Sequence, residues 1–487
     1  MEKVKKVLHQ YKFLIALILI GTLLRLFRIE ASLQFLGDQG RDALVWLKMI
    51  QEFDLPFIGP ITSVGGFFLG PLYYYMMAPF LLLSNFNPVG PAIATAIIGV
   101  LTIPAIYFIT KEMLSKTAAN FTTLLYAIGS MPVILTRNAW NPNPMPLATL
   151  GIVYGFYKAR TTSKTSWLLL SAISLGVALQ LHYMIVFLGP FILIQLVNII
   201  KIKKLRLKII YWFLSLIALM IPLILFEIKN NFINFSGLIE YLTKNKYQQF
   251  NFLQTFRDVK GRSEQAIGML LGFGEQYSIF RVWLSRLIWI PGLILLFKKP
   301  SLGYKTTAFW LFLSIISIAF YRGVIPAYYI AFIMPSVFML VGFLLSLFKG
   351  KLKFIPFIFI AIFIYFNSQS LYKALSETGN LKSVKKTAQF ILSDVKDNNY
   401  QNYNLTLIDG TKDYKAYSFR YYLKALGGTP LGIDQYPETN ILYLVSPYFQ
   451  TDILAKETWE IKSLKPAKVT QTWEFEGSEN IYKIERL

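Results

Sequence analysis

The sequence predicts a polytopic α-helical membrane protein with about eleven spanning helices, interfacial helices and a small extracytoplasmic α/β domain at the C-terminus. Hydrophobic residues make up 55% of the 487 residues and charged residues only 15%, whereas soluble domains are about 25% charged. Apolar runs of spanning length recur through residues 1–370. Residues 371–487 lack such runs and alternate predicted helices with predicted strands, which is typical of a small α/β domain.

A helix needs about 20 apolar residues to cross a bilayer, and each predicted span is an apolar run of roughly that kind. Several of the runs are short or joined by almost no loop. The apolar stretch Pro71–Leu83 is also short, and we predict that it forms an interfacial or re-entrant helix. The predicted spans are 13–29, 89–110, 117–135, 145–158, 166–182, 183–200, 209–226, 282–297, 306–321, 328–348 and 354–370.

Clusters of Lys and Arg predict the orientation of the chain. The formal net charge is +23, and the basic clusters fall in every second connection between spans, as cytoplasmic loops require. The N-terminus is then inside and the C-terminal domain outside the cytoplasmic membrane. This explanation of the charge leaves no reason to expect a nucleic-acid partner. The absence of Cys excludes disulfides and thiolate metal sites.

Three segments on the predicted outer face are too long to be simple connectors: 29–87, 227–281 and 371–487. Loops longer than about 12–15 residues are usually functional or disordered. We therefore assign 1–370 to one transmembrane domain with two large outer loops. In the tail we predict helices over 381–395 and 414–425 and strands over 403–408, 441–446, 469–475 and 481–484.

The most informative segment is Gly37-Asp38-Gln39-Gly40-Arg41-Asp42, directly after the first span. The apolar spacing that follows predicts an amphipathic helix over Ala43–Phe53 lying on the outer membrane surface. Asp42 stands at the N-cap position of that helix. Asp38 is not needed as a cap, so it is the candidate to face a cavity; a solvated loop acid is the alternative.

Three further outer corners carry polar residues, which usually face a cavity when they lie at membrane depth. They are Arg137–Pro144, Gln180–Tyr183 and Tyr321–Tyr329. His182 alone cannot form a three-His zinc site; a divalent metal held by Asp38 with His182 and a structural histidine both stay open. Arg322 is expected either to bind a lipid phosphate or to extend to the headgroups.

A glycine-rich and tyrosine-rich stretch precedes the short apolar helix. Its glycines lack the Lys and Ser/Thr of a P-loop, so we interpret them as turn residues. The run Gly70-Pro71-Leu72-Tyr73-Tyr74-Tyr75 is expected to anchor a re-entrant helix or to line a sugar site.

In their order along the chain, these motifs resemble the GT-C superfamily of membrane glycosyltransferases. The resemblance is closest to the branch that holds protein O-mannosyltransferases and lipid A aminoarabinose transferases, and it covers roughly the first 350 residues. It rests on the acidic first outer loop and on the stretches 70–74, 137–143, 180–183, 226–227 and 326–335.

The resemblance implies a GT-C-like fold, a lipid-phosphate sugar donor and no nucleotide sugar. It also implies that the loop aspartate, here Asp38, is the general base. The chain departs from many relatives at Gln39, where they have Glu, and at Gly70, where they have His. It lacks the Trp-Trp-Asp signature of oligosaccharyltransferases, which argues against a pyrophosphate-linked oligosaccharide donor.

We therefore expect an inverting glycosyltransferase that moves a sugar from a polyprenyl-phosphate donor to an acceptor hydroxyl of a protein, lipid or cell-surface glycan. A lipid-linked glycan transporter or flippase, a glycan polymerase or ligase, and a non-catalytic receptor are the alternatives. The expected site residues are Asp38 as the base, Arg137, Arg322 and Arg41 for the donor phosphate, and Tyr73, Tyr74, Trp140, Asn141, His182 and Tyr183 for the sugar or acceptor.

Overall fold

The computed structural model of the protein describes residues 2–62, 66–244, 252–274, 278–298, 300–321, 323–410, 413–474 and 479–487. The chain divides into two compact units. The second unit combines the C-terminal residues with two segments of the first predicted outer loop, so it is larger than the predicted domain 371–487, and the domain boundaries stay a prediction. The first unit comprises Met1–Phe27, Pro56–Met76 and Ala92–Ser376, and the second Arg28–Leu55, Met77–Pro91 and Glu377–Leu487.

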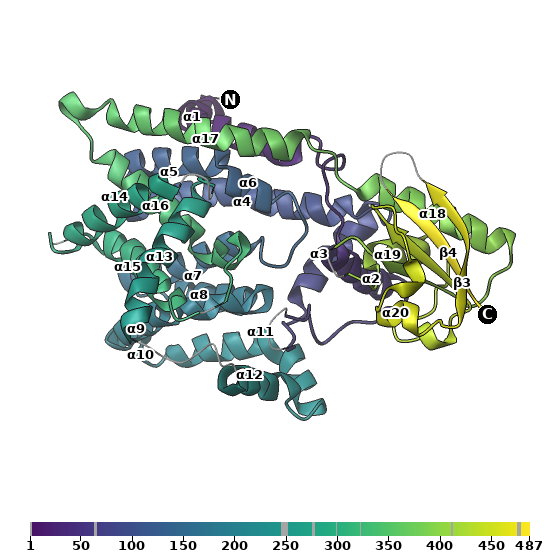
Figure 1. Cartoon of the computed structure of the whole chain (residues 1–487). Helices are drawn as coiled ribbons and strands as arrows, with labels where there is room; N and C mark the ends of the chain where they lie inside the picture. The colour runs from purple at the N-terminus through teal and green to yellow at the C-terminus, as the bar shows by residue number, and fades with distance from the viewer. Residues whose placement is uncertain are drawn as a thin grey trace. The chain divides into compact units, whose positions relative to one another are not determined.

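The first unit is built from helices (Figure 1). Every predicted span falls on a helical segment, and 117–135 divides between two helices at Gly129, where the backbone is extended. The helices are α1 (Glu2–Leu26), α4 (Val89–Met113), α5 (Lys116–Ile128), α6 (Ser130–Leu135), α7 (Met145–Thr162), α8 (Thr165–Leu181), η1 (Tyr183–Leu188), α9 (Gly189–Ile200), α10 (Lys203–Arg206), α11 (Ile209–Lys229), α12 (Ile233–Lys244), α13 (Phe252–Leu270), α14 (Ser278–Leu296), α15 (Leu302–Ile318), η4 (Ala327–Ile333), α16 (Met334–Ser346), η5 (Gly350–Leu352) and α17 (Ile355–Ser376).

Within the described ranges, seven helical stretches are long and apolar enough to cross a membrane. The number of crossings stays a prediction, as does the orientation. The predicted short helix after Pro71 is α3 (Leu72–Leu83), which has only 12 residues. A straight helix of that length spans about 18 Å, less than the roughly 30 Å of a bilayer core.

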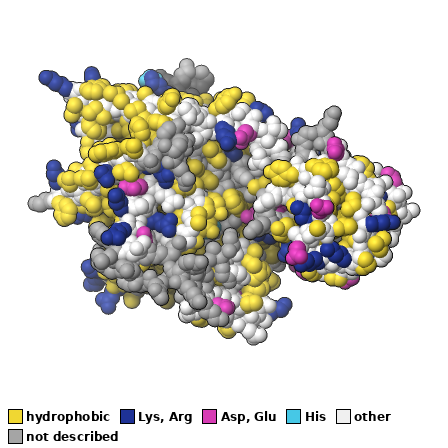
Figure 2. Space-filling model, viewed as in Figure 1, with side chains coloured by type: hydrophobic (Ala, Val, Ile, Leu, Met, Phe, Trp, Pro, Cys, Tyr) yellow, Lys and Arg dark blue, Asp and Glu magenta, His cyan; other side chains and the backbone are white. Residues whose placement is uncertain are grey.

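Large apolar side chains stay exposed on several of these helices. Figure 2 shows such side chains gathered over α17. Soluble monomers rarely expose apolar patches larger than a few hundred Å², whereas lipid tails cover them at no cost. Exposed examples on α11, α14 and α17 are Ile217, Leu225, Trp283, Leu287, Phe357 and Ile364.

Small residues hold the helices of the first unit close together. A methyl group on Gly155 of α7 would lie 2.9 Å from Ser171 Cβ of α8, and one on Gly342 of α16 would lie 2.7 Å from the backbone nitrogen of Thr122 on α5. Such small-residue contacts drive helix association where lipid removes the hydrophobic driving force.

The second unit contains a four-stranded sheet, in the order β1-β2-β4-β3. β1 (Tyr403–Leu407) and β2 (Ile441–Ser446) are parallel, and β4 (Asn480–Arg486) is antiparallel to both β2 and β3 (Ala467–Glu474). With α18 (Leu381–Asp397) and α19 (Tyr417–Ala425), these elements confirm the predicted α/β tail.

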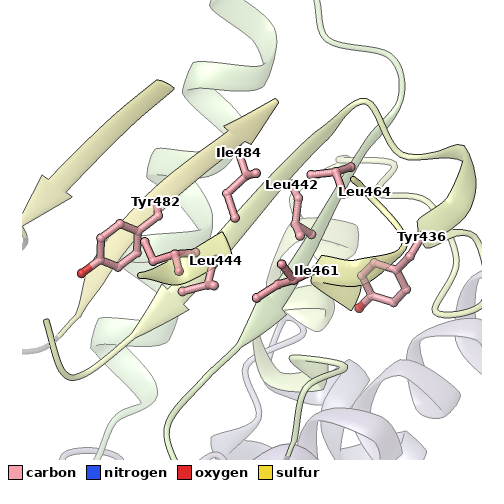
Figure 3. Close-up of a cluster of buried hydrophobic side chains, with 8 residues drawn as sticks. Tyr436, Leu442, Leu444, Ile461, Leu464, Tyr482 and Ile484 are labelled. Atoms are coloured by element: carbon pink, nitrogen blue, oxygen red, sulfur yellow. The ribbon is translucent and has the colours of Figure 1, made fainter. Parts of the chain in front are cut away.

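The two faces of the sheet are covered by different elements, because successive residues of a strand point to opposite sides. On one face Leu442 and Leu444 of β2 pack with Tyr482, with Ile461 of α20 (Trp459–Lys462) and with Tyr436 of η6 (Tyr436–Glu438) (Figure 3). On the other face Tyr443 donates a hydrogen bond of 2.5 Å to Asp394 of α18. This hydrogen bond joins β2 to α18 on the second face of the sheet. A further short helix, η7, runs over Ile453–Ala455.

The helix predicted for the first outer loop also belongs to the second unit. The amphipathic helix is confirmed as α2 (Gly37–Gln51), but it begins six residues before the predicted start. Gln39 Oε1 accepts a hydrogen bond from the Leu36 N–H at 3.2 Å and so supports the early start. Its apolar residues Ala43, Trp46 and Leu47 are buried in the protein.

Candidate active site

Asp38 lies in the first turn of α2, with its side chain 49% exposed. Arg41, one turn later, donates from Nη1 to Asp38 Oδ1 at 2.9 Å. Among the described residues, none donates a hydrogen bond to the other carboxylate oxygen, Oδ2. The carboxylate is therefore oriented through one oxygen while its side chain remains open to solvent.

Arg41 is itself held by a buried acid, Asp42. Its Nε and Nη2 donate to Asp42 Oδ1 at 3.0 and 2.9 Å, and the Asp42 side chain is fully buried. The prediction that Asp42 caps the helix is wrong, because α2 begins at Gly37 and Asp42 lies inside it. A donor-phosphate role for Arg41 stays a prediction, and its guanidinium here bonds two carboxylates.

A second carboxylate, Asp413, lies against the start of α2. A methyl group on Gly37 would come within 2.6 Å of Asp413 Cγ. Burial raises the pKa of Asp413 to about 7, and the negative charges of Asp409 and Asp38 act in the same direction. The Tyr417 N–H and Arg420 oppose this increase in pKa. Burial therefore favours the protonated form of the Asp413 carboxyl.

The residues at this site do not form an evident metal centre. In the part of the chain that the structure describes, no three His, Asp or Glu side chains group as metal ligands. Asp38 Oδ1 and Asp42 Oδ1 both accept from Arg41, and Gln39 Oε1 accepts the Leu36 N–H. A divalent metal held by Asp38 with His182, one of the two alternatives left open by the sequence, is not tested by these contacts.

In the first unit, two of the predicted site residues, Trp140 and His182, lie next to the aromatic rings of Tyr328 and Tyr329. The Trp140 ring lies 4.4 Å from that of Tyr328, and the His182 ring 4.8 Å from that of Tyr329, between ring centroids. His182 Nδ1 accepts the Met184 N–H at 3.2 Å, so the proton of the neutral ring is on Nε2. We call Trp140, His182, Tyr328 and Tyr329 the aromatic cluster.

Tyr183 takes part in a different arrangement. Its hydroxyl donates to the Phe68 carbonyl at 2.7 Å. The same backbone unit is held by Asn234, which accepts the Phe68 N–H at 2.7 Å and donates to its carbonyl at 3.2 Å. Glu227 in turn accepts the Asn234 N–H at 3.1 Å at the start of α12. The strand-like segment before Gly70 is thus fixed by α12.

The corner residue Asn141 and the residue Gln180 are both used in internal hydrogen bonds. Asn141 donates to the Leu181 carbonyl at 2.5 Å. Gln180 accepts the Leu72 N–H at 3.2 Å and donates to the Leu219 carbonyl at 2.9 Å. Gly70 lies so close to Gln180 that a side chain there would displace it. These contacts align the start of α3 with α8 and α11.

Arg137 is 6% exposed and lies at the end of α6. Its Nη1 donates to the carbonyls of Leu24 and Arg25 at 2.9 and 3.1 Å. Arg25 is fully buried on α1, and it donates to the Gly21 and Ala127 carbonyls at 3.1 and 3.2 Å. Two guanidinium groups therefore bond the backbone carbonyls near the end of α1.

The remaining predicted site residues are Tyr73, Tyr74 and Arg322. The side chains of Tyr73 and Tyr74 are 0% and 4% exposed, so neither presents an open ring face in this conformation. Arg322 lies outside the described residues. The flanking carbonyls of Tyr321 and Gly323 accept hydrogen bonds from Arg262 Nη2 of α13, at 2.9 and 3.0 Å.

Sequence reasoning missed three residues of these arrangements: Arg25, Asn234 and Asp413. A cation within an apolar span is a signal that identifies Arg25. The other two give no local signal, because their contacts join distant parts of the chain; Asn234 is 166 residues from Phe68.

A family model described as dolichyl-phosphate-mannose-protein mannosyltransferase matches residues 69–226. The matched segment contains Tyr73, Tyr74, the corner at Arg137 and the residues His182 and Tyr183. No curated protein sequence matches the chain.

Solved structures share the fold at low sequence identity. ArnT from Cupriavidus metallidurans bound to undecaprenyl phosphate is 11% identical, with a TM-score of 0.63 over 98% of each chain. The Archaeoglobus fulgidus oligosaccharyltransferase in complex with Zn and sulfate is 14% identical, with a TM-score of 0.58 over 89% of this chain and 68% of that one.

The archaeal oligosaccharyltransferase AglB from Archaeoglobus fulgidus, in complex with an inhibitory peptide and a dolichol-phosphate, is 13% identical, with a TM-score of 0.53 over 90% of this chain and 70% of that one. At such identities the likeness shows the fold alone. The chain therefore contains a segment similar to that mannosyltransferase family and has the fold of ArnT and of the archaeal oligosaccharyltransferase.

Proposed function

We propose that the protein transfers a sugar from a polyprenyl-phosphate donor to an acceptor hydroxyl on the outer face of the membrane, with inversion at the anomeric carbon. The observation that carries the proposal is the environment of Asp38. Its carboxylate is half exposed, is oriented by Arg41 through one oxygen, and belongs to the first predicted outer loop. A general base must be within reach of the proton that it abstracts and must be held in a defined orientation.

The reaction needs one proton transfer and one displacement. Asp38 takes the proton of the acceptor hydroxyl, and the acceptor oxygen forms a bond to the anomeric carbon. The bond between that carbon and the phosphate oxygen breaks, and its electron pair leaves with polyprenyl phosphate. A positioned base contributes roughly 10²–10⁴-fold to the rate of such a step.

The leaving phosphate requires cationic partners, because negative charge develops on it. We propose Arg322 as the first candidate and Arg137 as the second. Arg137 Nη1 already donates to the Leu24 and Arg25 carbonyls, which supports a part for Arg137 in shaping its corner as well. For Arg322 the proposal rests on the sequence and on the family resemblance.

The sugar requires aromatic faces and polar neighbours. The aromatic cluster supports this role for Trp140 and His182, because their rings lie next to Tyr328 and Tyr329. Tyr183 and Asn141 are proposed to shape the site through the backbone that they hold. The position of Tyr73 and Tyr74 in the interior favours a structural contribution to the same region.

The test uses the purified full chain in lipid nanodiscs with a panel of polyprenyl-phosphate sugars and hydroxyl acceptors, followed by mass analysis of the products. Asp38→Asn is compared with Asp54→Asn, an exposed acid that follows α2 and pairs with Lys48. We expect Asp38→Asn to lose roughly 10²-fold or more in turnover, with donor binding retained, and Asp54→Asn to match the wild type.

Two results would contradict the proposal. Wild-type turnover by Asp38→Asn removes this residue from the mechanism. Movement of radiolabelled glycan across sealed vesicles without covalent product, in the same preparation, indicates a transporter instead.

A further inference from the structure

The C-terminal part of the second unit packs directly on the helix that carries Asp38. Gly37 and Gly40 lie one turn apart on the same face of α2. A methyl group on Gly40 would lie 2.6 Å from Ser418 Cα, and one on Gly37 would lie 2.6 Å from Asp413 Cγ. The atoms near Gly40 are backbone, so only glycine fits there, whereas the atoms near Gly37 belong to the Asp413 side chain. This face of α2 is therefore in direct contact with residues 413–418.

The backbone before α2 is fixed by the same part of the chain. Asn380 accepts the Phe35 N–H at 2.6 Å and donates to the Phe35 carbonyl at 3.3 Å. The Gly379 N–H donates to the Ala31 carbonyl at 2.8 Å. The Phe35 ring lies 5.6 Å from that of Tyr421 on α19, between centroids. The backbone segment before α2 is therefore held in place by residues 379–421.

Asp413 meets the first turn of α2 through its carboxyl group, which lies against Gly37. Its neighbour Asp38 comes directly after Gly37, so any shift of the Gly37 backbone moves the Asp38 carboxylate with it. The ion pair with Arg41 belongs to the same turn and does not fix the turn against the sheet. The contact between Gly37 and Asp413 therefore adds to the Gly40 and Phe35 contacts that hold this turn, and it directly adjoins Asp38.

We propose that Asp413 is a positioning residue for Asp38: it sets the place of the first turn of α2, and so of the catalytic carboxylate, from within the C-terminal residues. This inference rests on the proposed function of Asp38. It assigns the C-terminal α/β part a role in the chemistry in addition to its own fold. A displacement of about 1 Å at a reacting group can cost about 10²-fold in rate.

The test changes the contact from both sides. Asp413→Ala removes the carboxyl group, and Gly37→Ala pushes on it without removing it. We expect each variant to lower kcat by roughly 10- to 100-fold while the KM for the polyprenyl-phosphate donor stays within about twofold. Asp413→Asn keeps the shape and a carbonyl oxygen, and we expect it to restore most of kcat.

Matched controls separate positioning from general damage. Asp434→Asn changes an exposed acid of the same unit, and Gly261→Ala adds a methyl group that meets no atom within 4 Å. Both are expected to behave as the wild type. If Asp413→Ala does not fold, Gly37→Ala with its retained carboxyl group carries the test.

The outcomes are distinguishable from failure of the proposed function. Wild-type kcat in both Asp413→Ala and Gly37→Ala, with Asp38→Asn inactive, overturns the positioning role alone. An increase in donor KM with kcat unchanged also overturns it. Wild-type activity of Asp38→Asn overturns the proposed function as well.

Discussion

Arg41 bonds Asp38 on one side and, on the other, the fully buried Asp42. The ion pair between Arg41 and Asp42 is anchored in the interior, and it therefore gives the exposed Asp38 a fixed partner. A single turn of α2 holds all three residues, which makes the orientation of Asp38 a property of that turn.

We predict that Arg41→Ala destabilises the protein strongly. Removal of one partner of a buried ion pair costs about 3–5 kcal/mol, because the Asp42 carboxylate loses its guanidinium. The measurement is thermal unfolding of the variant in detergent, followed by the fluorescence of Trp46 and its neighbours. Asp42→Asn added to Arg41→Ala is expected to recover much of the loss, whereas equal stability of wild type and Arg41→Ala contradicts the role of this pair.

Much of the fold follows from the sequence, because apolar length and residue alternation are local signals. The spans and the strands of the tail have such signals, and the structure confirms helices and strands at those places. The local sequence signal for the start of α2 is weaker. The cap formed by Gln39 and the contact of Phe35 with Asn380 move that start to Gly37, and the second of these contacts joins residues far apart in the chain.

The candidate site is less predictable for the same reason. Asp38 stands out by position, but Asp413 becomes part of its surroundings only when α2 and α19 pack together. Asn234 acquires its role from the backbone of Phe68, which no local pattern indicates. Conversely, Tyr73 and Tyr74 look suitable for binding a sugar, and the interior of the first unit takes up both.

We predict that Asn234→Leu destabilises the segment before Gly70. The side chain forms two hydrogen bonds with the Phe68 backbone and is 9% exposed. Leaving such buried backbone groups unpaired costs about 1–3 kcal/mol each. The measurement is proteolytic susceptibility around residues 56–70 together with the unfolding temperature. Asn230→Leu on the exposed end of α11 is the control, and equal behaviour of the two variants would sink the prediction.

The stability of the second unit should depend on the pKa of Asp413. Its pKa in the folded protein is raised to about 7, above the usual value near 3.9. The folded state therefore binds the proton more tightly than the unfolded state does, and the free energy of unfolding falls as pH rises through this window. The unfolding temperature of the wild type should fall between about pH 5 and about pH 8, and we expect Asp413→Asn to reduce that fall. An unchanged pH dependence contradicts the assignment.

The donor phosphate is predicted to depend on Arg322 more than on Arg137. Arg137 Nη1 is committed to the carbonyls at the end of α1, so its replacement should lower stability first. We expect Arg322→Ala to raise the KM for the polyprenyl-phosphate donor by about tenfold, which corresponds to about 1.4 kcal/mol, and to leave the acceptor KM unchanged. Arg262→Gln is the informative comparison, because Arg262 holds the carbonyls on both sides of position 322. If the donor KM rises in Arg262→Gln as in Arg322→Ala, the position of that corner is what the donor requires. If neither variant changes donor KM, the phosphate binds elsewhere and the assignment of Arg322 fails.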